Sequence, residues 1–83
     1  MEKKHIGQHI SHQFNEEIED IRNKVLVMGG LVEQQALDAI EALSSGDIEL
    51  AEQVVQNDSS VNALESEIDE DCLLIIAKRQ PAA

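Results

Sequence analysis

Apolar residues recur at helical spacing along nearly the whole chain, and this pattern constrains the fold more than any other feature. In the first half they recur three or four residues apart, at Phe14, Ile18, Ile21, Val25, Met28, Val32, Ala36, Ala39 and Leu43. The second half carries a similar stripe, formed by Leu50, Val54, Val61, Leu64, Ile68, Cys72 and Ile75. A repeat of this kind is typical of long helices that pack along one face against a neighbouring helix. We therefore predict an all-α protein.

A short polar segment separates the two stripes. Gly46 suits the left-handed residue that closes a helix, and Asp47 suits the cap that opens the next one. We predict a helix over residues 11–44 with Ser11 as its N-cap, a turn over 44–47, and a second helix over 48–79 that Pro81 prevents from continuing. A connection this short makes the helices antiparallel neighbours. Residues 1 to 12, with three histidines, are expected to be a partly ordered polar start.

Composition narrows the class of protein. The chain of 83 residues carries a formal net charge of -11 and a single cysteine. A surface of that sign repels phosphate backbones, so no nucleic-acid binding is expected. No apolar run reaches the roughly 20 residues of a membrane span, and no direct membrane insertion is expected. One cysteine forms no internal disulfide, which favours a reducing compartment. We therefore expect a cytoplasmic protein.

The apolar stripes are wider than a two-helix contact requires. Leu26, Leu37 and Ile40 extend the first stripe sideways, so two helices alone would leave apolar flanks in water. We expect a third helix absent from this chain, or a second copy, to cover them, and we predict a homo-oligomer. Gly29 and Gly30 lie within the first helix and predict the close approach of another backbone or a gentle kink.

A row of oxygen-bearing side chains runs along the second helix. Asp58, Asn62, Glu65 and Asp69 recur four, three and four residues apart and follow the apolar stripe by one residue. Carboxylates one helical turn apart repel each other unless a cation bridges them. The row is therefore a candidate ligand set for Mg, Mn, Fe or Zn, completed by a facing helix. Ordinary solvation of a helix face is the alternative.

Several other groups receive a simpler interpretation. Glu67, Glu70 and Asp71 are expected on the solvated outer face, and Cys72 is expected to be an inert, buried thiol. Asp38 and Glu41 are candidates to complete the metal site only if they face the row. No acid/base pair or nucleophile triad is evident, so we do not expect an enzyme.

Two runs of residues make the sequence resemble the PhoU family of phosphate-signalling regulators. They are MGGLVE at 28–33 and VNALESEID at 61–69, with matching residues at 9–11, 14, 72 and 79–81. The resemblance implies that the chain is an amino-terminal, partial PhoU-like domain over 1–83, with helices one and two of a three-helix bundle and the third helix absent. The family's acidic E-x-x-x-D metal motif then corresponds to Glu65 and Asp69.

The resemblance also implies a function. Family members act as negative regulators of the phosphate-starvation response and couple a phosphate ABC transporter ATPase to a phosphate-sensor histidine kinase through protein–protein contacts. Two alternatives stay open from the residues themselves. They are a metal-binding helical module and a purely structural helical module that docks to a basic partner.

Overall fold

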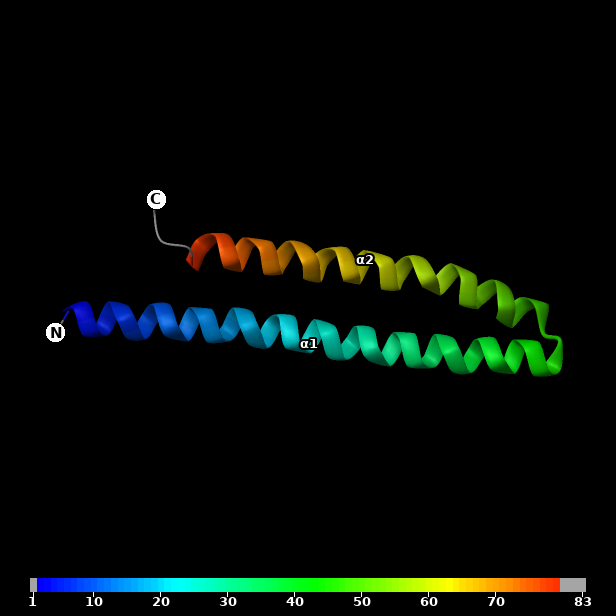
Figure 1. The fold of residues 1–83 in the computed structure, drawn as a ribbon. Coiled ribbons are helices and arrows are strands. Elements are labelled where there is room, and N and C mark those ends of the chain that lie inside the picture. The colour runs from blue at the N-terminus through cyan, green and yellow to red at the C-terminus, as the bar shows by residue number, and fades with distance from the viewer. Residues whose placement is uncertain (1, 80–83) are drawn as a thin grey trace.

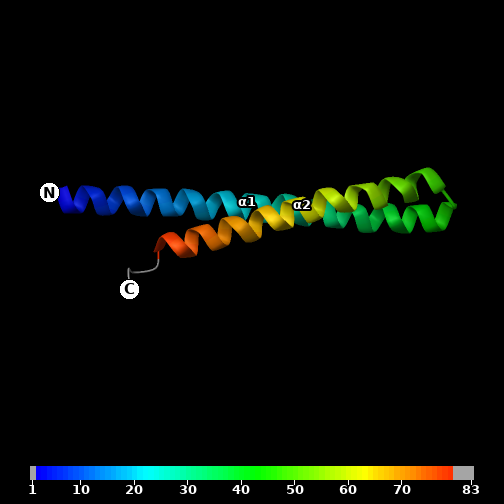
Figure 2. The same ribbon diagram turned by 90° about the horizontal axis from the view of Figure 1, so that it is seen from above.

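Two long helices form an antiparallel hairpin, as Figures 1 and 2 show from two directions. The computed structural model describes the backbone of residues 2–79 and the side chains of residues 12–79. Helix α1 spans Glu2–Ser45 and helix α2 spans Ile48–Arg79. The hairpin is elongated, with extents of 66 × 24 × 12 Å. The predicted all-α hairpin is confirmed.

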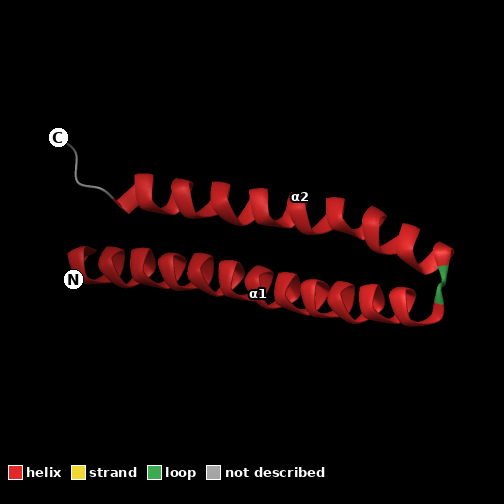
Figure 3. Cartoon of the chain, turned by 45° about the vertical axis from the view of Figure 1, so that its right-hand side comes forward, coloured by secondary structure: helices red, strands yellow, loops and turns green. Residues whose placement is uncertain are grey.

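The turn between the helices follows the predicted chemistry (Figure 3). Gly46 has a φ of 70°, a left-handed conformation in which any Cβ would be strained. This conformation lets the backbone N–H groups of Gly46 and Asp47 both donate to the Ala42 carbonyl oxygen, at 2.9 and 3.1 Å. The Asp47 carboxylate accepts a hydrogen bond of 3.1 Å from the Leu50 N–H and so caps the start of α2.

The core is a thin line of apolar side chains between the helices. Ala42, Ile68 and Ile75 are buried. Half-buried residues continue the line along both helices: Phe14, Ile18, Ile21, Met28 and Ala39 on α1, and Leu50, Val54, Val61, Leu64 and Cys72 on α2. Two helices in contact leave most of each circumference in water, which is why the described residues form no larger core.

The contact line on α1 departs from the predicted stripe from the middle of the helix onward. Val25, Val32 and Leu43 were expected to face the partner helix, but they are 43%, 47% and 85% exposed. Gln35 and Ala42 lie closer to α2 than these residues do. The buried or half-buried residues of α1 include Phe14, Ile21, Met28, Gln35 and Ala42, which lie seven residues apart, so the contact keeps a heptad repeat. The apolar stripe instead takes two successive steps of four residues, from Met28 to Val32 to Ala36, and so rotates away from the contact.

Two further details of α1 differ from expectation. The helix begins at Glu2 and not at Ser11, since residues 2–10 contain no proline and only one glycine to interrupt it. The predicted close approach at Gly29 and Gly30 is not made by any described residue, because a Cβ on either glycine would meet no atom within 4 Å. Pro81 and its neighbours, residues 80–83, lie outside the described residues.

Candidate functional site

The acidic row, formed by Asp58, Asn62, Glu65 and Asp69, lies along the exposed flank of α2. Ile68 beside it is buried and Leu64 is half-buried against α1, so the row borders the interhelical contact. Asp58 is held by the Gln35 side chain, whose amide Nε2 donates to Asp58 Oδ1 at 3.1 Å. Among the described residues, no ion pair involves Glu65 or Asp69. Their charges face solvent.

The opposite flank of the hairpin is held by a lysine between two carboxylates. Lys24 Nζ lies 2.6 Å from Asp71 Oδ2 and 2.9 Å from Glu67 Oε1. The hydrogen bonds that Lys24 donates, to Asp71 first and then to Glu67, raise the pKa of Lys24 above its ordinary value. The expectation that Glu67 and Asp71 belong to a purely solvated face is therefore wrong. Both residues lie one position before an apolar contact residue, which directs them toward α1.

The chain thus has two different sides, and a simple rule separates them. One side of the hairpin carries residues that precede a stripe residue. Lys24 binds Glu67 and Asp71 there, an arrangement that we call the lysine clamp. Asp38 and Ser60 line a small groove on the same side. Residues that follow a stripe residue are rotated by about 100° the other way. In antiparallel helices, the residues that come one position after a stripe residue therefore lie on the side opposite the lysine clamp in both helices.

By this rule the acidic row shares its side with those exposed residues of α1 that follow a buried or half-buried residue. Asp38 lies on the clamp side, where Gln34 Nε2 donates to its carboxylate at 2.9 Å. It therefore does not face the row. Gly29 and Ile40 each follow a half-buried residue and lie on the same side as Glu65 and Asp69.

The row has suitable donors for a hard cation but too few to enclose one. Carboxylate and amide oxygens are the ligands that Mg²⁺ and similar ions accept. Within the described part of the chain, however, no group of three or more His, Cys, Asp or Glu side chains is gathered closely enough to hold a metal. These residues alone do not form a complete centre. Any metal bound here needs ligands from outside the described residues.

Two smaller features were missed by sequence reasoning. Glu17 Oε1 lies 3.7 Å from Lys78 Nζ and 3.8 Å from Arg79 Nη2, and the Arg79 guanidinium stacks 4.8 Å from the centroid of the Phe14 ring. These contacts join the end of α2 to α1. Their only sequence signal is the pair of cations in the last turn of α2.

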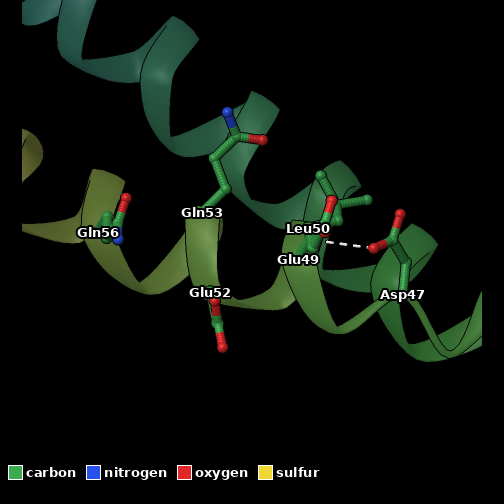
Figure 4. A pocket seen from close by; sticks show the side chains of 6 residues that line it. All are labelled: Asp47, Glu49, Leu50, Glu52, Gln53 and Gln56. Atoms are coloured by element: carbon green, nitrogen blue, oxygen red, sulfur yellow. Dashed lines mark hydrogen bonds between the residues drawn. The ribbon is translucent and has the colours of Figure 1, made fainter.

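The second missed feature is a polar hollow at the start of α2. It has a volume of about 390 Å³ and is lined by Asp47, Glu49, Leu50, Glu52, Gln53 and Gln56 (Figure 4). The Asp47 carboxylate is already used in capping α2. No cationic side chain lines this hollow.

The geometry describes a helical module with acidic and apolar side chains exposed along both helices. Comparison with known proteins identifies it further. The PhoU domain profile matches residues 25–83, and the chain belongs to the PhoU family. Within the described residues no helix is both long and apolar enough to cross a membrane.

Similar proteins carry consistent names. The phosphate-specific transport system accessory protein PhoU of Serratia marcescens is 58% identical over 83 residues, and that of Escherichia coli K12 is 52% identical over 83 residues. The PhoU homolog of Pseudomonas aeruginosa is 52% identical over 81 residues, which is 98% of this chain. In each case the match covers 34% of the relative's length, so the chain spans about a third of these proteins. No solved structure matches.

Proposed function

We propose that this chain belongs to an accessory regulator of phosphate transport that restrains the phosphate-starvation response. The observation that carries the proposal is its identity of 52–58% over the whole chain to proteins named as accessory proteins of the phosphate-specific transport system. The strongly acidic surface supports action on proteins, because it repels nucleic acids and anionic lipids.

The proposed mechanism is protein–protein contact in the cytoplasm. The partners are a phosphate-sensor histidine kinase and the ATPase of a phosphate ABC transporter. Exposed acidic and apolar side chains on the same flank of the hairpin suit partners with basic and apolar surfaces. In this mechanism the protein keeps the kinase inactive while phosphate is plentiful.

A deletion experiment tests the regulatory role. We expect cells that lack the gene to express a phosphate-starvation reporter in phosphate-rich medium, and cells with the restored gene to silence it. A reporter that stays silent after deletion contradicts the proposal. Co-purification with the kinase and the transporter ATPase tests the partners, and cell fractionation tests the cytoplasmic location.

Metal binding by the acidic row is the second candidate function. It is favoured by the solvent-facing carboxylates of Glu65 and Asp69, one helical turn apart. Equilibrium dialysis of the protein with Mn²⁺, Fe²⁺ and Zn²⁺ tests it, with the double variant Glu65→Gln, Asp69→Asn as the comparison. If the variant still binds the kinase and transporter while the native protein retains no metal, the contact is purely structural.

A further inference from the structure

Most acidic side chains of the described hairpin face water, but three carboxylates are half-buried. They belong to Glu17, Asp38 and Asp71. Partial burial of a charge costs free energy unless an opposite charge or hydrogen bonds offset it. Two of the three carboxylates are offset by cations of this chain. Glu17 Oε1 lies 3.7 Å from Lys78 Nζ, and Asp71 Oδ2 lies 2.6 Å from Lys24 Nζ.

Asp38 is the third half-buried carboxylate, and it is not paired with a cation. Among the described residues no ion pair involves it, and its hydrogen-bond donor is the neutral amide of Gln34, whose Nε2 lies 2.9 Å from Asp38 Oδ1. Residues 25–77 contain no lysine, arginine or histidine. The preceding cation on the same helix, Lys24, is roughly 21 Å away at 1.5 Å per residue. A cation for Asp38 therefore has to come from another molecule.

Asp38 lines a small groove between the two helices, on the side of the lysine clamp. Leu31 of α1 and Val61 of α2 give the groove apolar walls, and Asn57 and Ser60 of α2 add polar groups. Its volume is about 140 Å³. Sites for drug-sized ligands measure roughly 300–1,000 Å³, and one water takes about 30 Å³. The groove therefore suits a single long side chain with an apolar stem and a charged end.

We propose that this groove binds a lysine side chain of a partner protein, with the stem along Leu31 and Val61 and the ammonium group at Asp38. Lysine suits the carboxylate better than arginine, because Asp38 Oδ1 already accepts a hydrogen bond from Gln34. The other oxygen is enough for a compact ammonium group, whereas the guanidinium fork binds best to both oxygens of a carboxylate. This inference goes beyond the proposed function, since it does not depend on which protein carries the lysine.

Titration with short peptides, followed by nuclear magnetic resonance of the isotope-labelled chain, tests the site. The probe is acetyl-Ala-Lys-Ala-amide, and its norleucine analogue keeps the stem without the charge. We expect the lysine peptide to shift the backbone amide resonances of Leu31, Asp38 and Val61, and to bind more weakly as salt is added. The norleucine peptide should bind about tenfold more weakly, the loss expected on removing a hydrogen bond between charged groups.

A pair of matched variants assigns the binding to one carboxylate. Asp38→Asn should weaken binding of the lysine peptide about tenfold, while it keeps an oxygen that accepts from the Gln34 amide. Asp20→Asn is the control, because it removes the same charge from an exposed position of the same helix outside the groove, and it should leave binding unchanged.

Several results would overturn the proposal. They are equal binding of the lysine and norleucine peptides, equal weakening by Asp38→Asn and Asp20→Asn, and resonance shifts spread evenly over the exposed acidic residues. Tighter binding of an arginine peptide than of the lysine peptide also overturns it. Circular dichroism of each variant shows whether the helices are retained.

Discussion

Replacing Ile68 by alanine tests whether the thin line of contact between the helices holds the hairpin together. Ile68 is 8% exposed and lies near the middle of α2. Removing a large buried aliphatic side chain costs about 2–5 kcal/mol, with the smaller values where the surroundings can collapse into the space. The open flanks of a two-helix hairpin permit such collapse. Alanine also favours the helix by a few tenths of a kcal/mol over isoleucine. We therefore expect a net loss of about 2 kcal/mol.

For a domain of this size such a loss lowers Tm by roughly 8–16 °C. The assay is thermal and urea unfolding followed by circular dichroism, at a fixed protein concentration. Ile76→Ala is the matched control, because it is the same substitution on the same helix at a residue that is 56% exposed. It should leave stability unchanged or slightly raised. Equal Tm values for Ile68→Ala and Ile76→Ala would refute the proposed helix contact.

Three further predictions concern single contacts. Lys24→Met removes the clamp to Glu67 and Asp71, and its effect depends on pH. Because folding raises the pKa of Lys24, the stabilisation is complete below its ordinary value of 10.5 and is lost as pH rises through the folded value. Above the ordinary pKa of lysine, the free energy of unfolding of the native chain should therefore fall with pH more steeply than that of the variant. The same pH dependence in both proteins would count against the clamp. Asp47→Ala removes the cap of α2 and should cost about 1 kcal/mol, while Asp47→Ser should restore most of it in urea unfolding. Gly46→Ala places a Cβ at positive φ and should cost about 1 kcal/mol, with Gly46→Asn less harmful; no loss of Tm in the alanine variant would contradict the turn geometry.

The local features of the hairpin could be predicted because each depends on neighbouring residues alone. Gly46 adopts the positive φ of the turn without strain and Asp47 caps α2 with its side chain, and both act in the turn as expected. The burial of Ile68 and Ile75 follows from helical period alone. Metal binding by Glu65 and Asp69 stays a prediction, because it depends on ligands that no described residue supplies.

The amino-acid sequence by itself determined that two helices form, where the chain reverses, and that their apolar surface exceeds what they can bury against each other. Only the tertiary structure decided which flank each charge occupies. The sequence pattern placed Glu67 on the solvated outer face, yet Glu67 binds Lys24, while Glu65 faces solvent on the opposite side. The physical reason is rotation. Each residue turns the side chain by about 100°, so an offset of one residue between the apolar stripe and the contact line, as at Val25 and Lys24, changes which residues meet.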